Sequence, residues 1–318
     1  MRKSKEELRI VFMGTPEFAV ESLKILVEGG YNVVGVVTMP DKPAGRGYKV
    51  QFSPVKQYAL ENNLLLLQPE KLKDEIFLEN LQSLKADLQI VVAFRMLPEI
   101  VWNMPPLGTF NLHGSLLPQY RGAAPINWAI INGEKETGVT TFFLTHEIDT
   151  GKIILQEKIP ILPSDNAGTL HDKLMMLGAS TVKKTVDLII SDAVQPIDQS
   201  ELLKNTIELR SAPKIFRENC EIDVSWDVER AHNFVRGLSP YPGAWMNLVF
   251  PHTDEKTVLK IFQAEKEFSS HQLPLGSLET DGKKFAKIAL KDGFLVLKEV
   301  QAPNKKRMEI GEFLRGLR

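Results

Sequence analysis

Short apolar runs and longer amphipathic stretches alternate through the first 190 residues. The runs at 8–13, 31–38 and 87–94 predict buried strands, and the helix expected between the first two ends near Gly29-Gly30. A strand-helix-strand opening is typical of a parallel sheet. The later pattern predicts helices near 54–62, 71–84 and 123–132, a strand at 139–145, a hairpin arm at Lys152–Ile161 and a long helix at 168–190.

The tail after residue 210 has a different pattern. A helix at about 227–238 is followed by short alternating runs that predict strands near 244–250, 257–268, 284–290 and 294–301. This pattern indicates a small antiparallel, OB-like β-barrel. We therefore expect an α/β chain with a mostly parallel N-terminal domain at 1–191, a polar linker at 192–209 and a β-barrel domain at 210–318.

Local signals refine the first domain. Thr15 suits the N-cap of the first helix and Pro16 its first turn. The stretch 39–49 holds two prolines and two glycines, so we expect no regular structure there. Lys42, Arg46 and Lys49 place positive charge on this loop, which suits phosphate binding. By composition alone, we favour the interpretation that residues 39–49 form an ordinary solvated surface loop.

The candidate chemistry lies on the strand that includes 108–113. Asn111 and His113 are two apart, so they share one face of that strand, at its end. Asp149 lies in a tight loop beyond the strand at 139–145. If these residues converge, they combine an amide donor, an imidazole and a carboxylate, which suits attack of an amine on a carbonyl.

Other interpretations of these residues remain open. Asn111 is also compatible with a strand-end cap, His113 with a buried histidine, and Asp149 with a turn residue. No Ser or Cys stands in a nucleophile elbow, and no Gly-x-Gly-x-x-Gly follows the first strand. His146 and His171 lack metal-ligand spacing, so no metal is expected.

Composition adds few constraints. The net charge is −1, and residues 210–318 hold 18 basic and 15 acidic residues against 21 and 25 in the rest. This difference is too small to indicate nucleic acid alone. The single cysteine, Cys220, excludes an internal disulfide and has acidic neighbours that disfavour a thiolate. The N-terminus has no apolar signal region, so a cytoplasmic monomer is expected.

Several motifs together resemble the folate-dependent formyltransferases. They are Met-Gly-Thr-Pro-Glu-Phe-Ala at 13–19, Asn-Leu-His-Gly-Ser-Leu-Leu-Pro at 111–118, Tyr-Arg-Gly-Ala-Ala-Pro-Ile-Asn-Trp-Ala at 120–129 and Glu-Ile-Asp-Thr-Gly at 147–151. Pro-Asp-Lys-Pro-Ala-Gly-Arg-Gly at 40–47 and the second domain narrow the resemblance to the family's methionyl-tRNA formyltransferases. The resemblance covers essentially the whole chain.

The resemblance implies a Rossmann-like catalytic domain that uses 10-formyltetrahydrofolate as co-substrate and initiator Met-tRNA as acceptor. It places the family's catalytic residues on Asn111, His113 and Asp149. It assigns the folate-contacting turn to Ser115, Leu116, Leu117 and Pro118, and tRNA contacts to the loop with Lys42, Arg46 and Lys49 and to the C-terminal barrel.

Two positions depart from the family pattern. Lys42 stands where many relatives carry Arg, and Arg95 lies in a segment that would line the folate pocket. A formyltransferase acting on a small-molecule amine and a non-catalytic RNA-binding folate sensor are the alternatives.

Overall fold

The computed structural model describes residues 3–44, 49–203, 208–250 and 256–317. The chain divides into two compact units. The first comprises residues 1–122, 137–159 and 171–211, and the second comprises 123–136, 160–170 and 212–318. No helix in the described ranges is both long and apolar enough to span a membrane.

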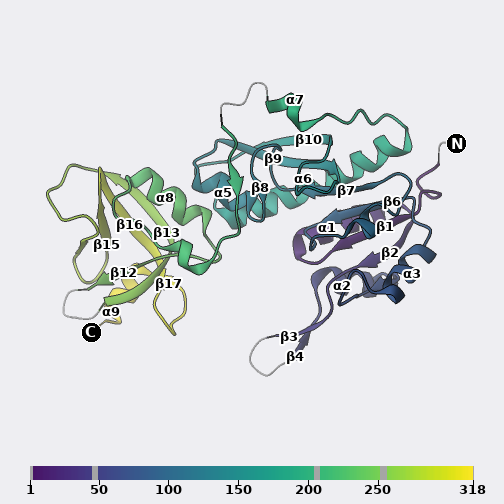
Figure 1. Ribbon diagram of the computed structural model, residues 1–318. Helices are drawn as coiled ribbons and strands as arrows, with labels where there is room; N and C mark the ends of the chain where they lie inside the picture. The colour runs from purple at the N-terminus through teal and green to yellow at the C-terminus, as the bar shows by residue number, and fades with distance from the viewer. Residues whose placement is uncertain (1–2, 45–48, 204–207, 251–255, 318) are drawn as a thin grey trace. The chain divides into compact units, whose positions relative to one another are not determined.

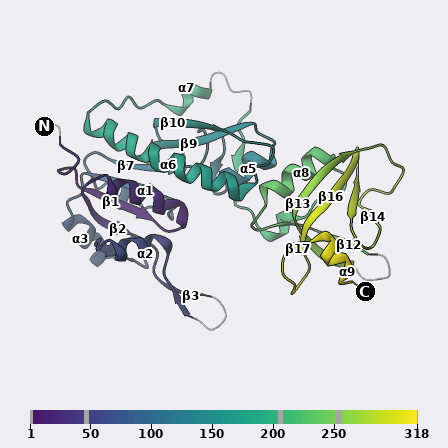
Figure 2. The ribbon, with the colours of Figure 1, turned by 180° about the vertical axis from the view of Figure 1, so that it is seen from behind.

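The first unit is built on a seven-stranded sheet of order β10-β9-β7-β6-β1-β2-β5 (Figures 1 and 2). The neighbours β1–β2, β1–β6, β2–β5 and β6–β7 are parallel, whereas β9 runs antiparallel to β7. The expected mostly parallel α/β domain is therefore confirmed. The elements up to residue 203 are β1 (Ile10–Gly14), α1 (Glu17–Glu28), β2 (Val33–Val37), β3 (Lys42–Ala44), β4 (Lys49–Gln51), α2 (Pro54–Glu61), β5 (Leu66–Leu67), α3 (Glu75–Ser83), β6 (Leu88–Val92), α4 (Glu99–Trp102), β7 (Thr109–His113), β8 (Arg121–Gly122), α5 (Pro125–Ile131), β9 (Glu136–Phe143), β10 (Ile153–Pro160), α6 (Ala167–Ile190) and α7 (Gln199–Leu203).

Both faces of this sheet are covered. On one face, Phe77 of α3 and Val101 of α4 join a buried cluster with Val11, Met13 and Val91. On the other, α6 approaches β7 so closely that a Cβ on Gly178 would lie 2.7 Å from Leu112. The apolar and polar residues of β7 therefore lie on opposite faces of the sheet. Leu112 contacts α6, and Asn111 lies on the same face as its register partner Val91.

Two local expectations were wrong. Residues in the stretch 39–49 do form regular structure, because β3 and β4 pair as an antiparallel hairpin in which Pro43 lies opposite Val50. A two-stranded hairpin consists only of edge strands, where proline is tolerated. Helix α1 begins one residue later than predicted, with Pro16 as its N-cap. The predicted hairpin arm at Lys152–Ile161 is confirmed as strand β10, which lies beside the preceding strand β9 in the main sheet.

The second unit contains a curled antiparallel sheet of order β12-β13-β16-β15-β14, with β17 added to β16. The expected antiparallel β domain is confirmed, as a half-barrel. The elements after residue 203 are β11 (Ser211–Ala212), the 3-10 helix η1 (Arg217–Cys220), α8 (Val228–Gly237), β12 (Ala244–Val249), β13 (Lys256–Phe268), β14 (Leu278–Thr280), β15 (Ala286–Leu290), β16 (Gly293–Gln301), β17 (Met308–Glu309) and α9 (Ile310–Arg315).

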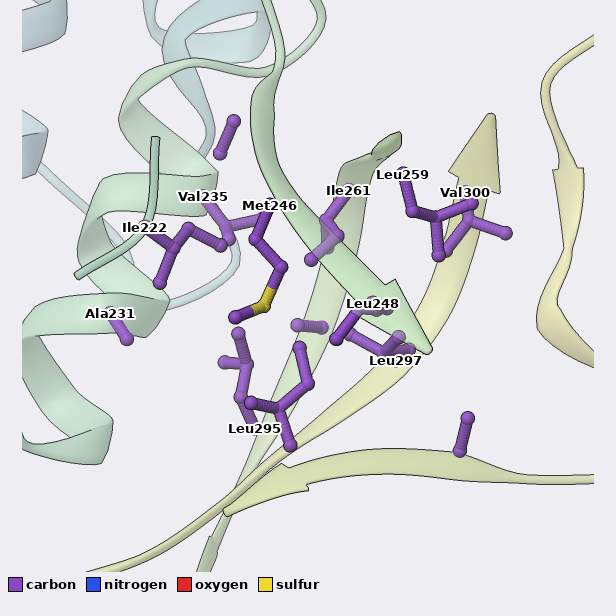
Figure 3. Packing of buried hydrophobic residues seen from close by; sticks show 14 of the residues in the cluster. Ile222, Ala231, Val235, Met246, Leu248, Leu259, Ile261, Leu295, Leu297 and Val300 are labelled. Atoms are coloured by element: carbon purple, nitrogen blue, oxygen red, sulfur yellow. The ribbon is translucent and has the colours of Figure 1, made fainter. Parts of the chain in front are cut away.

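Helix α8 packs into the concave side of this sheet. Figure 3 shows Ala231 and Val235 of α8 facing Met246, Ile261 and Leu295 from three strands. All five side chains are buried. Burial of a valine, methionine, isoleucine or leucine side chain contributes roughly 1.5–3 kcal/mol, so this apolar cluster is the core of the second unit.

Candidate active site

Asn111 and His113 stand on β7 at the carboxyl edge of the parallel strands. The register pairs Asn111 with Val91 on one side and with Phe142 on the other, and pairs His113 with Thr140. Asn111 is partly exposed, and its amide makes no hydrogen bond to any residue in the described ranges. In open α/β sheets, ligands bind outside the carboxyl ends of the strands. The Asn111 amide is therefore available to a ligand there.

The imidazole of His113 is buried, with 6% of the residue exposed, and both ring nitrogens face polar atoms. Nε2 lies 2.8 Å from the carbonyl oxygen of Tyr120. Because a carbonyl oxygen can only accept, Nε2 carries the hydrogen of this bond. Nδ1 lies 3.8 Å from Oδ2 of Asp149, which is longer than a hydrogen bond. Nδ1 is thus the nitrogen left to act on a ligand.

Asp149 is held by its backbone and by one contact to its carboxylate. Its φ of 55° lies in the left-handed region, which aspartate tolerates better than most residues. The backbone N–H of Gly122 donates to Oδ2 at 3.0 Å. Two residues on, a Cβ at Gly151 would lie 1.6 Å from the carbonyl oxygen of Phe143. The Asp149 loop therefore lies against β9 at a distance that only glycine allows.

The turn after His113 is fixed by hydrogen bonds to β9 and β10. Oγ1 of Thr140 donates to the carbonyl oxygen of Ser115 at 2.6 Å and accepts from the backbone N–H of Leu117 at 3.1 Å. Nε2 of Gln156 donates to the carbonyl oxygen of Leu117 at 2.7 Å. Ser115, Leu117 and Pro118 are buried, and Leu116 is partly exposed. The turn is therefore a rigid wall whose buried side chains hold its shape.

Arg95 binds protein backbone next to the site. Its guanidinium donates to the carbonyl oxygen of Glu70 at 2.8 Å and to that of Pro69. Burial lowers the pKa of this guanidinium. Arg95 thereby fastens the end of β6 to the chain that follows β5.

The remaining candidate residues lie in different settings. Arg46 lies outside the described residues, and only the backbone of Lys42 and Lys49 is described, in the hairpin β3–β4. Cys220 is buried in the second unit, and burial raises the pKa of its thiol. His146 pairs with Glu99 at 3.5 Å, and the ring of His171 packs edge-on against Phe18.

Sequence reasoning missed the residues that support this site. Thr140, Gln156 and Gln199 are polar residues that bond to its loops. Strand β9 is buried continuously from Thr137 to Phe142, so no alternation marks Thr140, and nothing local marks Gln199. It lies in α7, inside the segment predicted as a polar linker.

Models of two protein families match the chain: Formyl transferase over residues 8–186 and Formyl transferase, C-terminal domain, over residues 214–318. A methionyl-tRNA formyltransferase of Bacteroides thetaiotaomicron is 64% identical over 314 residues, covering 99% of this chain and 97% of that protein. One of Flavobacterium johnsoniae is 54% identical, covering 98% and 97%.

Solved structures share the fold at low identity. An N-formyltransferase from Helicobacter canadensis in complex with folinic acid and dTDP-3-aminofucose has a TM-score of 0.62 at 23% identity, over 92% of this chain and 98% of that one. HypX from Aquifex aeolicus, in complex with tetrahydrofolic acid, has a TM-score of 0.63 at 19% identity, over 97% and 48%. The chain belongs to the formyltransferase family, in which it groups with the methionyl-tRNA formyltransferases.

Proposed function

We propose that this protein transfers the formyl group of 10-formyltetrahydrofolate to the α-amino group of methionyl initiator tRNA. The observation that carries the proposal is the grouping of the Asn111 amide, His113 Nδ1 and the Asp149 carboxylate at the end of β7. Identity above 60% to several proteins named methionyl-tRNA formyltransferase supports the choice of acceptor.

The reaction is a direct transfer between two substrates. The amine nitrogen attacks the formyl carbon, a new C–N bond forms, and the bond from that carbon to the folate nitrogen breaks. The amine loses a proton, and the departing folate nitrogen takes one up. An α-amino group has a pKa of about 7.7–8.0, so part of it is neutral near pH 7. Placement and charge stabilisation therefore matter more than a strong base.

Each polar residue takes a separate role in this proposal. The Asn111 amide donates to the oxygen that becomes negative during attack. His113 donates to the same oxygen through Nδ1, since Nε2 is bonded to the Tyr120 carbonyl. Asp149 stabilises the charged ring and relays the proton from the amine. One oxyanion donor is typically worth ~2.7–4 kcal/mol.

The two substrates require different surfaces. The turn Ser115 to Pro118 forms the wall for the folate, through its backbone and the partly exposed Leu116. Lys42, Arg46 and Lys49 contact the phosphates of the tRNA. In this proposal residues 1–191 are the catalytic domain, 192–209 the linker and 210–318 the tRNA-binding domain. The protein acts as a cytoplasmic monomer and needs no metal.

The test is a formylation assay with the full chain, 10-formyltetrahydrofolate and three acceptors: charged initiator tRNA, charged elongator Met-tRNA and free methionine. We expect rapid formylation of the initiator tRNA and much slower reaction of the other two. Asn111→Ala should lower kcat roughly 10²–10³-fold, as removal of an oxyanion donor does. Equal rates with free methionine would refute the tRNA acceptor, and full activity of the variant would refute the mechanism.

A further inference from the structure

The side chain of Gln199 is buried in a segment whose neighbours are exposed. Only 2% of Gln199 is accessible, whereas Asp198 and Ser200 on either side are exposed. A buried amide must find partners, because an unpaired polar group inside a protein costs about 1–3 kcal/mol. The partners of Gln199 lie far away in sequence, in the two loops that carry and hold Asp149.

The amide of Gln199 is fully hydrogen-bonded. Nε2 donates to the carbonyl oxygen of Asp149 at 2.9 Å and to that of Gly151 at 2.8 Å. Oε1 accepts from Arg121 twice, from Nε at 3.1 Å and from Nη2 at 2.6 Å. Both donor hydrogens and both acceptor positions are therefore used. One side chain joins the Asp149 loop to the Tyr120–Gly122 segment.

Those two segments fix the catalytic geometry described above. Gly122, next to Arg121, donates its backbone N–H to Oδ2 of Asp149, and Tyr120 accepts from His113. Gln199 thus links the segment 120–122 to the Asp149 loop. Both of these segments orient the His113–Asp149 pair. Loss of this link should leave the Asp149 carboxylate free to turn from His113.

The backbone beside Gln199 is itself anchored to the sheet. Ile197 and Ile153, the first residue of β10, exchange two backbone hydrogen bonds at 2.8 and 2.9 Å. The Gln199 amide therefore starts from a fixed point two residues away. The amide can therefore restrain the Asp149 loop, even though Gln199 lies within the segment 192–209.

We propose that Gln199 is a positioning residue, which holds the Asp149 carboxylate toward His113 for formyl transfer. The part of this proposal that concerns kcat rests on the proposed function. The structural part, which is the restraint of the loop 145–152 by Gln199, is independent of it. The two parts can therefore be tested by separate measurements on the same variants.

Two substitutions distinguish the hydrogen bonds that Gln199 makes to the Asp149 loop from those that it makes to Arg121. Gln199→Leu removes all four hydrogen bonds. Gln199→Glu keeps an acceptor for Arg121 but loses the donors to Asp149 and Gly151. Ser200→Ala is the matched control, because Ser200 lies on the same helix, is exposed, and donates its hydroxyl to Asp198. We expect both Gln199 variants to lower kcat roughly 10–100-fold, as loss of an outer hydrogen-bond partner does at functional sites, with KM unchanged.

A double-mutant cycle with Asp149→Ala distinguishes positioning from general stability. If Gln199 acts through Asp149, Gln199→Leu lowers kcat in the wild type and has no further effect once Asp149 is absent. An equal loss in both backgrounds would overturn the proposal. Full kcat in Gln199→Leu and Gln199→Glu would overturn it as well.

Amide hydrogen exchange measures local opening of the Asp149 loop without any substrate. We expect faster exchange in a peptide covering residues 145–152 for both Gln199 variants, and unchanged exchange for Ser200→Ala. Unchanged exchange in Gln199→Leu would overturn the proposal. A wild-type protein that fails to formylate any acceptor, with the exchange result as expected, would refute the proposed function and leave the loop restraint standing.

Discussion

The Nδ1 atom of His113 lies 3.8 Å from Oδ2 of Asp149, and the same oxygen accepts a hydrogen bond from the backbone of Gly122 at 3.0 Å. The ring and the carboxylate are thus aligned without being bonded. In the proposed mechanism Nδ1 donates to the substrate oxygen, and the nearby carboxylate stabilises the charge of the protonated ring. The Gly122 bond sets the direction from which the carboxylate approaches the ring.

Replacement of Asp149 by Asn tests the charge of this pair. Asp149→Asn keeps the size and can still accept from Gly122, so the loop should keep its shape. We expect kcat to fall roughly 10²–10⁴-fold, the range for acid–base assistance, with little change in KM. Asp192→Asn is the matched control, because Asp192 is exposed and has nearly the same φ, 54° against 55°. Wild-type kcat in Asp149→Asn would exclude a role for the charge.

Gly151 tests whether the loop must lie against β9. In Gly151→Ala the new Cβ would meet the carbonyl oxygen of Phe143 at 1.6 Å, so the loop has to move away. We expect a large loss of kcat and a lower Tm. Gly316→Ala is the control, since within the described residues the nearest atom to its new Cβ would be the carbonyl oxygen of Phe313, at 3.4 Å, which is an ordinary contact distance. An active, stable Gly151→Ala protein would show that the position of Asp149 does not depend on this contact.

Thr140 tests the support of the turn that follows His113. Thr140→Val keeps the shape of the side chain but leaves the carbonyl of Ser115 and the N–H of Leu117 without this partner. We expect a loss of about 1–3 kcal/mol in the free energy of unfolding, as for unpaired buried groups. If the turn binds the folate, the KM for 10-formyltetrahydrofolate should rise too. Thr257→Val on β13 should change neither, and an unaltered Thr140→Val protein would contradict the assignment.

The part of the site on β7 could be predicted from sequence because alternation along a strand is a local property. Asn111 and His113 are two residues apart, and the structure places Asn111 on the face opposite the α6 contact of Leu112. Asp149 could be expected near a strand end because a short loop follows an apolar run. Its roles with His113 stay a prediction until activity is measured.

What the sequence could not reveal depends on contacts between distant residues. Gln199 reaches Asp149 across 50 positions, and a polar segment looks the same whether its glutamine is buried or solvated. The hairpin β3–β4 was missed because proline and glycine were taken to exclude pairing, although Pro43 pairs with Val50. The side chain of Arg95 binds the backbone of residues 69 and 70, which are 26 and 25 positions away, and no local pattern indicates that contact.

His232 gives the second unit a defined sensitivity to acid. Burial lowers the pKa of His232 from 6.5 to about 4, with further lowering by the charges of Arg236 and Lys266, against the opposing effect of Glu229. The folded state therefore binds fewer protons than the unfolded state between those values. Stability should be fully present above about pH 6.5 and fall as the pH drops toward 4.

The measurement compares denaturant unfolding of the wild type and His232→Gln from pH 7.5 down to 4.5, since glutamine does not titrate. We expect the denaturant midpoint of the wild type to fall more steeply with acid than that of the variant. Other groups titrate in both proteins alike, so only the difference between the two slopes reports His232. Parallel slopes would mean that His232 titrates near its ordinary pKa, and that its ring is more open to water than its position on α8 indicates.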